Sequence, residues 1–406
     1  MEDRTDKTLR VGAAKIDITP HGRTVNLAGF GFGRRSTGVL DPLFARAIHI
    51  SHGGEWVVLV SADLIGLFRG FVEGVRTRLR DDLGDASRVL VCCTHNHDGP
   101  DTMGYWGRSL FDAIPIRSGA DPAYMEELGA KIAQVVRAAK ADALPVAAFR
   151  GRAVAPPALA ENVRRPGHKD DALEWLRFDG PDGSPKAHVL NFACHPEALW
   201  SRNTLLSADY PGVLCGLVEQ HTGGTALFFS GALGGMVTPN MEESASLPDR
   251  RRFMESMGRA LFERLLESEG RAAPIDSPAV RHARRVFSVP VSNRVFRLLG
   301  AVGVLSREGT TGRRIVTETH MVRIGDALLF GAPGELLPSM GFMLKAGLSR
   351  SPAIFTLGLC CDELGYILAP DEFGQKTYRF ERSMSVGTGL TKEVLESAFD
   401  LAARVL

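Results

Sequence analysis

The sequence predicts an α/β fold, and two observations support this prediction. Short apolar or β-branched runs alternate along the chain with longer stretches in which apolar residues recur at helical spacing. The short runs are also apolar enough to be buried on both faces of a sheet, as in the α/β class. With 406 residues, the chain is long enough for two or three average domains or for one large α/β unit.

Two kinds of apolar pattern predict the individual strands and helices. Continuous apolar runs predict strands, in chain order, at 55–63, 88–95, 187–195, 226–231, 327–334 and 353–359. Apolar residues at helical spacing predict helices at 71–84, 123–141, 249–268 and 392–406. The apolar stretch 289–305 is interpreted as a strand pair or as the lining of a pocket. Segment 272–280 is the best candidate for a domain boundary, although a compact loop explains it equally well.

Composition and charge exclude several classes of function. The chain is 44% hydrophobic and 23% charged, with a formal net charge of +1, so its charge does not favour nucleic acid or an anionic membrane surface. The basic clusters at 250–252 and 281–287 are short, and we interpret them as solvated faces. The longest apolar run, 56–68, contains Asp63 and is too short for a transmembrane segment.

The N-terminus and the cysteines indicate a compartment. The first residues are charged and lack the apolar core of a signal peptide. The chain has six cysteines, and their spacing fits neither a disulfide framework nor a CxxC zinc knuckle. We therefore expect a cytoplasmic enzyme with reduced thiols.

Potential metal ligands follow several of the predicted strands. His95 and His97 come after the second run, His195 after the third, and Glu335 after the fifth. Loops at the carboxyl ends of strands in open α/β sheets converge on one crevice. Two histidines separated by one residue on an extended chain point to the same face, and zinc binds histidine nitrogens and carboxylate oxygens. The combination predicts a metal site, which the His-x-His pair alone would not.

Each of these residues also has a structural interpretation. His95 can be a hydrogen-bonded turn residue after a strand, and His195 can be a residue at a helix start. Glu335 can cap a helix N-terminus, where carboxylates are favoured. For Asp63 and Asp209, support of a metal-bound histidine and capping remain open alternatives.

Several sequence blocks resemble the catalytic domain of the neutral/alkaline (non-lysosomal) ceramidase family. They are "VGAAKIDITP", "VVLVSADL", "THNHDGPD", "ENVRRP", "LNFACHPEAL", "GMVTPN", "APGEL" and "LGYILAPDEFGQKTY", in the family's order, from about residue 11 to 380. The resemblance implies one domain over residues 1–406, built from two packed mixed β-sheets flanked by helices. It also implies a zinc-dependent amidohydrolase that cleaves an N-acyl (amide) bond by metal-activated water.

The resemblance assigns roles to individual residues. The implied zinc ligands are His95, His195, Glu335 and Tyr366. The implied catalytic residues are His97, Arg164, Tyr378 and Thr238. His97 and Tyr378 would assist the substrate carbonyl, and Arg164 would lie near the reaction centre. Thr238 occupies the serine position of the family's Gly-Asp-Val-Ser-Pro-Asn block.

The chain departs from the family pattern in three ways. Met236 and Thr238 replace the aspartate and the serine of that block, the chain ends at Leu406 without room for a C-terminal β-sandwich, and a secretion signal is missing. We therefore expect conserved chemistry on a soluble small-molecule or lipid-like N-acyl substrate, with no nucleic-acid partner. A zinc-dependent esterase or lactonase on the same site, and an inactive metal-binding homologue that acts as an interaction module, remain alternatives. A TIM-barrel amidohydrolase does not fit, because the spacing does not supply eight regular βα units.

Overall fold

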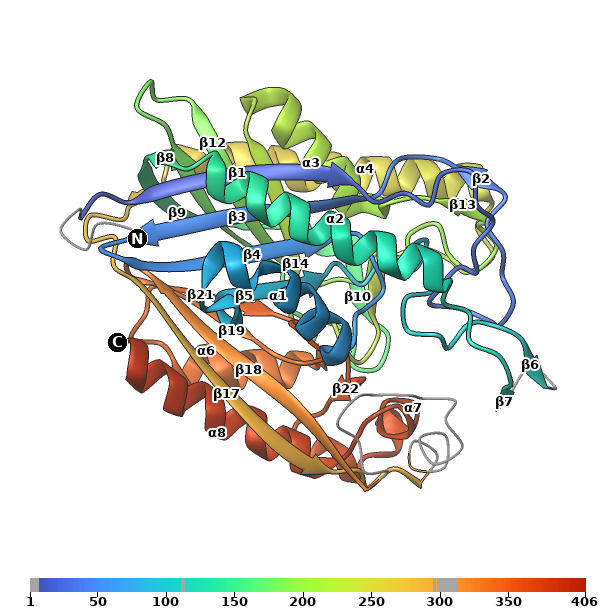
Figure 1. The fold of residues 1–406 in the computed structure, drawn as a ribbon. Helices are drawn as coiled ribbons and strands as arrows, with labels where there is room; N and C mark the ends of the chain where they lie inside the picture. Colours follow the sequence, from blue (N-terminus) through green and yellow to red (C-terminus); the bar gives the residue numbers. More distant parts are fainter. Residues whose placement is uncertain (1–6, 111–113, 295–296, 298–312) are drawn as a thin grey trace.

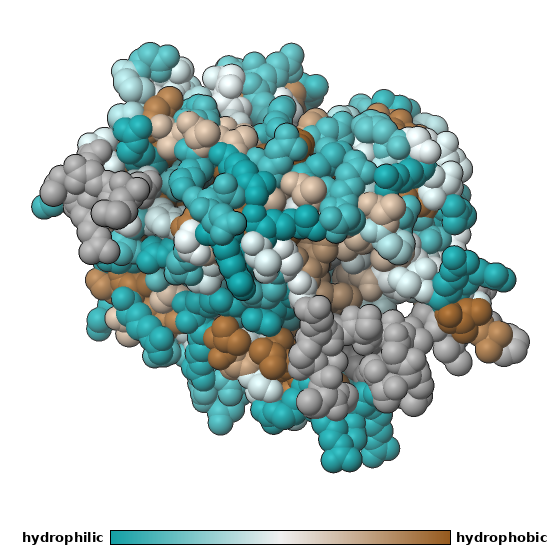
Figure 2. All heavy atoms as spheres, viewed as in Figure 1, coloured by the Kyte–Doolittle hydropathy of each residue, from teal (hydrophilic) through white to brown (hydrophobic). Residues whose placement is uncertain are grey.

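The fold is known from a computed structural model that describes residues 7–110, 114–294, 297 and 313–406 (Figure 1). The apolar stretch 289–305 lies mostly outside the described residues. Within the described ranges, no helix is both long and apolar enough to cross a membrane. On the face shown in Figure 2, hydrophilic residues predominate and exposed apolar side chains form small separate groups.

Three larger sheets form the framework. The first has the order β5-β4-β3-β1-β8, with β1 (Arg10–Asp17), β3 (Phe44–His52), β4 (Glu55–Ala62), β5 (Val89–Cys93) and β8 (Leu144–Pro145). The second has the order β14-β12-β11-β9-β16, with β9 (Ala147–Val154), β11 (Ala172–Asp179), β12 (Pro185–Phe192), β14 (Thr225–Ser230) and β16 (Ala273–Pro274). The third has the order β17-β18-β19-β21, with β17 (Val280–Pro290), β18 (Arg314–Ile324), β19 (Ala327–Gly331) and β21 (Ala353–Leu357).

Helices and short strand pairs complete the described part of the fold. The helices are α1 (Arg69–Leu83), α2 (Pro122–Ala141), α3 (Asp209–Thr222), α4 (Leu247–Glu269), α6 (Pro338–Gly347), α7 (Arg379–Ser383) and α8 (Thr388–Val405). The short pairs are β2 (Gly38–Val39) with β13 (Leu205–Leu206), β6 (Ser109–Leu110) with β7 (Ile114–Pro115), β10 (Ala160–Asn162) with β15 (Val237–Pro239), and β20 (Glu335–Leu336) with β22 (Tyr366–Ile367).

The first and second sheets pack face to face, and helices cover their outer faces (Figure 1). Side chains alternate across a strand, so Val189 of β12 enters the core between the two sheets while Leu190 enters the core beneath α3 and α4. Helices α1 and α2 pack on the first sheet, and α6 and α8 pack on the third. The sequence pattern explains these helices: α2 begins after Asp121, whose side chain accepts from the backbone N–H of Ala123.

Each larger sheet contains one parallel strand pair, and the carboxyl ends of these pairs meet. The pairs are β4 with β5, β12 with β14, and β19 with β21. Residues 358–361, directly after β21, connect all three sheets through backbone hydrogen bonds. Gly358 N–H donates to Ser230 O, Leu359 N–H to Gly334 O, and Cys361 N–H to Val91 O. The loops after β5, β12 and β19 are thereby brought to one place.

The prediction of packed mixed sheets flanked by helices is confirmed. A strand or helix lies at each of the predicted runs, although β5 ends at Cys93 and β12 at Phe192, before the histidines that follow them. Sequence reasoning missed the strands of mixed character β1, β3, β9, β11, β17 and β18, and the helix α3. A helix start was expected at Glu335, but Glu335 lies in β20 and α6 begins at Pro338. The third sheet goes beyond the two sheets that were expected. Segment 272–280 joins the second sheet to the third, and a single domain over residues 1–406 stays a prediction.

Candidate metal centre

The loops after β5 and β12 each present one histidine in a fixed orientation. His95 Nδ1 lies 2.9 Å from Ile65 O, and His195 Nδ1 lies 2.8 Å from Val237 O. Since a backbone carbonyl only accepts, each ring carries its proton on Nδ1 and exposes the lone pair of Nε2. His95 also adopts a left-handed backbone conformation, with φ of 65°, which is uncommon for a residue other than glycine. Both rings are therefore held as metal ligands commonly are.

Glu335 completes a group of three ligand atoms. Its Oε2 lies 3.2 Å from His195 Nε2 and 3.5 Å from His95 Nε2, and all three side chains are buried. The repulsion between these acceptor atoms is relieved either by a metal ion between them or by a proton on a histidine Nε2. Burial by itself lowers the pKa of His195, but Glu197 and Glu335 outweigh burial and raise the pKa to about 9. The position thus attracts positive charge, and its donor set is one that zinc prefers.

Tyr366 lies beside Glu335 because of a short parallel strand pair. Strands β20 and β22 place Glu335 directly opposite Tyr366. Burial raises the pKa of Glu335, but His95, His195 and a hydrogen bond from the Tyr366 hydroxyl outweigh this effect and lower it below its ordinary value. The predicted ligands His95, His195, Glu335 and Tyr366 therefore lie together. Their role in binding a metal remains a prediction.

His97 belongs to the same cluster. His95, His97 and His195 each offer a nitrogen, and these atoms all lie within 4.8 Å of one another. The side chain is 9% exposed, and neither ring nitrogen has a hydrogen-bond partner. Gly29 packs closely against His97, with φ of +92°, and a Cβ at this position would lie 2.4 Å from His97 Cγ. The ring is thus confined, while its nitrogens are available to a ligand.

Glu197 is a site residue that sequence reasoning missed. It is 2% exposed, its Oε2 lies 3.1 Å from His97 Nδ1, and its Oε1 accepts a hydrogen bond of 2.6 Å from Thr238 Oγ1. Predicted site residues His97 and Thr238 are therefore linked by one carboxylate. The available signal was the spacing His195-Pro-Glu197, because a carboxylate two residues after a candidate ligand returns to the same region.

Val163, which precedes Arg164, and Tyr378 both approach residues 235–236. The backbone N–H of Val163 donates to Met236 O, and a Cβ on Gly235 would lie 3.6 Å from Tyr378 Cε1. The Arg164 guanidinium pairs with Glu381 at 2.6 Å. Burial and a hydrogen bond to Glu372 raise the pKa of Tyr378 to about 12. The Arg164 guanidinium pairs with Glu381 and the Tyr378 hydroxyl with Glu372, and the catalytic roles of both residues stay predictions.

Asp63 and Asp209 bind backbone N–H groups of neighbouring segments, and neither caps a helix nor supports a histidine of the cluster. Asp63 Oδ2 accepts from Phe44 N–H and pairs with Arg46 Nη1 at 2.9 Å. Asp209, at the first turn of α3, accepts from the backbone N–H groups of Leu199 and Tyr210. These bonds hold loops that lead to the cluster, without contact to the ring nitrogens of the histidines.

A second buried group of potential ligands lies between α1 and the third sheet. It consists of Glu318, His320 and Cys361, which we call the arginine-bound cluster. His320 Nε2 lies 3.0 Å from Glu318 Oε1. Three guanidiniums surround the carboxylate at 3.1, 2.6 and 3.0 Å, from Arg69, Arg76 and Arg284 respectively. Arg284 comes from segment 281–287, so this arginine is paired and only 19% exposed, in contrast to the predicted solvated face.

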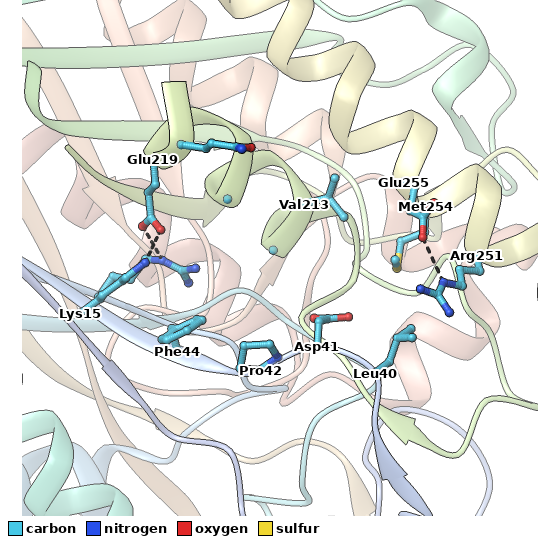
Figure 3. A pocket seen from close by; sticks show the side chains of 14 residues that line it. Lys15, Leu40, Asp41, Pro42, Phe44, Val213, Glu219, Arg251, Met254 and Glu255 are labelled. Carbon is cyan, nitrogen blue, oxygen red and sulfur yellow. Dashed lines mark hydrogen bonds and ion pairs between the residues drawn. The ribbon is translucent and has the colours of Figure 1, made fainter. Parts of the chain in front are cut away.

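A cavity of about 600 Å³ lies between the first sheet and helices α3 and α4 (Figure 3). Its lining includes none of the residues predicted for the metal site. Its basic side chains pair with acidic ones: Lys15 with Glu219, Arg46 with Asp63 and Glu219, and Arg251 with Glu255. Because these basic side chains are neutralised by acidic neighbours, they do not indicate a binding site for a charged ligand.

Comparison with known proteins identifies the fold. No family model and no curated protein sequence matches the chain. The crystal structure of neutral ceramidase from Pseudomonas aeruginosa matches with a TM-score of 0.79 and 19% identity, over 98% of this chain and 75% of that one. A ceramidase complexed with C2 matches with a TM-score of 0.79 and 17% identity, over 98% and 76%. The chain therefore has the fold of these ceramidase structures along nearly its whole length.

Proposed function

We propose that the chain is a zinc-dependent hydrolase that cleaves an N-acyl (amide) bond. The observation that carries this proposal is the convergence of His95, His195 and Glu335. Each comes from the loop after a different parallel strand pair, and each is buried and oriented by neighbouring groups. The same chain has the fold of two ceramidase structures, which favours an amide of a fatty or similar acid as the substrate class.

The metal would be held by His95, His195 and Glu335, with Tyr366 beside them. The opposed lone pairs of the two Nε2 atoms and the carboxylate support this set, as does their burial. Zinc, when bound, supplies a Lewis acid and lowers the pKa of water to about 7. The protein contributes the fixed histidine tautomers, since both Nδ1–H groups are bonded to backbone carbonyls.

Residues around the cluster would receive the substrate. His97 would face the reacting group through Nε2, which has no hydrogen-bond partner in the described protein, while Nδ1 lies 3.1 Å from Glu197 Oε2. The ring of Phe380, which is 50% exposed, lies 6.1 Å from that of Tyr366 and offers apolar surface to an acyl chain. Arg164 and Tyr378, which pair with Glu381 and Glu372, would assist the substrate from positions near residues 235–236. The described cysteines are all buried free thiols, which supports the expected cytoplasmic compartment.

Two histidine variants test the proposal. His95→Ala should lose zinc and activity together, because it removes a ligand. His97→Ala should keep zinc and lose about 10²–10³-fold in rate, as when one group that stabilises the transition state is removed. Metal content per chain and hydrolysis of an N-acyl amide are measured on the same samples. The enzyme proposal is lost if the purified protein carries no stoichiometric zinc and His95→Ala alters neither metal content nor hydrolysis.

A matched pair of substrates separates amide from ester chemistry. The two compounds share one acyl group and differ only in the atom that leaves, nitrogen or oxygen. We expect turnover of the amide that His95→Ala abolishes. Turnover of the ester alone would replace the proposal with the esterase or lactonase alternative.

A further inference from the structure

Glu197 connects two residues of the site that lie far apart in the chain. Its two carboxylate oxygens are used separately: Oε1 accepts from the Thr238 hydroxyl at 2.6 Å, and Oε2 lies 3.1 Å from His97 Nδ1. At 2% exposure, the carboxylate is covered and has no room to bind substrate itself. Its effect must therefore pass through its neighbours.

The backbone holds Glu197 and His97 in one unit. His97 N–H donates to Pro196 O, and Glu197 N–H donates to His195 O, so the two loops are joined next to the carboxylate. The ring of Phe30 contacts the His97 ring edge-on at 5.1 Å, and Gly29 packs closely against His97. The position of the imidazole is thus fixed by packing, and the remaining freedom is which ring nitrogen carries the proton.

The Glu197 carboxylate next to His97 Nδ1 favours one of the two positions for the ring proton. Glu197 Oε1 is occupied by the Thr238 hydroxyl, and Oε2 is an acceptor next to Nδ1. The two atoms lie 3.1 Å apart without the alignment of a hydrogen bond, so the carboxylate acts on Nδ1 through electrostatic attraction at short range. A proton on Nδ1 is stabilised there, as in other carboxylate–histidine pairs. Nε2 then remains as the ring atom for the reacting group.

We propose that Glu197 is a positioning residue of the site, which keeps a proton on His97 Nδ1, directs Nε2 to the substrate and orients the Thr238 hydroxyl. The kinetic part of this inference rests on the proposed hydrolase function. The protonation of His97 does not, because it is a property of the folded chain before any substrate binds.

Nitrogen NMR on the full-length protein as purified tests the inference directly. The protein is labelled with ¹⁵N-histidine, and the His97 signals are assigned by their loss in His97→Gln. We expect Nδ1 to carry a proton in the wild type. A neutral His97 ring with its proton on Nε2 overturns the proposal, and this result needs neither a variant of Glu197 nor a substrate.

Variants of two buried glutamates give the kinetic test. Glu197→Ala should shift the His97 proton away from Nδ1, keep one zinc per chain, and lower kcat about 10–100-fold with little change in KM. Glu174→Ala is the matched control, since Glu174 is also buried but pairs with Lys345, outside the site. It should leave the His97 signals and kcat unchanged.

Other outcomes separate this inference from the proposed function. Loss of zinc in Glu197→Ala overturns the positioning role, because Glu197 would then belong to the metal ligands. Unchanged His97 signals and kcat in a folded Glu197→Ala protein overturn it as well. If the wild-type protein contains no zinc and hydrolyses no amide, the proposed function is wrong. The NMR experiment still determines which nitrogen of His97 carries the proton.

Discussion

Two buried clusters in this molecule contain the same types of potential ligand, yet their carboxylates have opposite neighbours. Glu335 faces the Nε2 atoms of His95 and His195, which offer lone pairs. Glu318, in the arginine-bound cluster, is surrounded by three guanidiniums in addition to His320. The first carboxylate lacks a permanent positive partner, whereas the second has several.

The different neighbours of Glu335 and Glu318 show that residue type alone does not define a metal site. A divalent cation at Glu318 would have to displace or approach fixed guanidiniums, which cannot lose their charge. At Glu335, the same cation would meet one carboxylate and two oriented imidazoles. We therefore interpret the arginine-bound cluster as a structural tie between α1, the third sheet and the segment that follows β21.

The largest expected effect concerns metal content and rate. His195→Ala should reduce zinc to well below one ion per chain and lower hydrolysis on the order of 10³-fold or more, because it removes a ligand of a Lewis acid that contributes several kcal/mol. His320→Ala is the matched buried histidine of the other cluster, and it should leave both quantities unchanged. Metal analysis after gel filtration and a single rate assay suffice. An equal loss of zinc in His320→Ala would break the comparison.

A second prediction concerns stability. Glu318→Gln should lower the free energy of unfolding by about 3–5 kcal/mol, because it leaves buried arginines without their carboxylate. Glu335→Gln, measured in the presence of chelator, should cost less, since no guanidinium depends on Glu335. Urea unfolding at neutral pH measures both free energies. If the two variants were equally destabilised, the two carboxylates would not differ as described.

The smallest expected effect is the pH dependence of the stability that Glu318 contributes to the folded protein. Burial raises the pKa of Glu318, but His320, Arg76 and Arg284 outweigh burial and hold the pKa far below its ordinary value of 4.5. Arg69 and Glu73 also face this network. Because the pKa is lower in the folded state, the stabilisation is complete above pH 4.5 and decreases by about 1.4 kcal/mol per pH unit below it. The stability difference between wild type and Glu318→Gln should therefore shrink between about pH 5 and pH 3. A constant difference across this range would contradict the assignment.

The sequence predicted those parts of the fold in which one physical signal dominates. The strand β4 and the helix α2 have continuous or strictly periodic apolar residues, and they lie within one residue of the predicted bounds. Strand β17 was missed because its arginines and histidine suggested a solvated surface. Their partners, Glu318 for Arg284 and Glu393 for Arg285, come from distant segments. Helix α3 contains Pro211 and two glycines, which weaken its helical pattern.

The site was predictable where a ligand follows an apolar strand. His95, His195 and Glu335 met that condition, and the structure brings them together. Glu197 was missed because its importance comes from contacts with His97 and Thr238, whereas the spacing His195-Pro-Glu197 indicates only that it lies near His195. The charge partners of Arg164 and Tyr378 were unpredictable for the same reason.

The convergence of three strand ends has a consequence for folding. His195 and Glu335 are 140 residues apart in the chain, and His95 comes from yet another sheet. Contacts between such distant segments require the closure of long loops, which slows folding. A partly folded chain with only the first sheet formed would hold one of the proposed ligands and would have low affinity for zinc. Metal uptake would therefore be among the last events of maturation, and bound zinc would report that all three sheets have assembled.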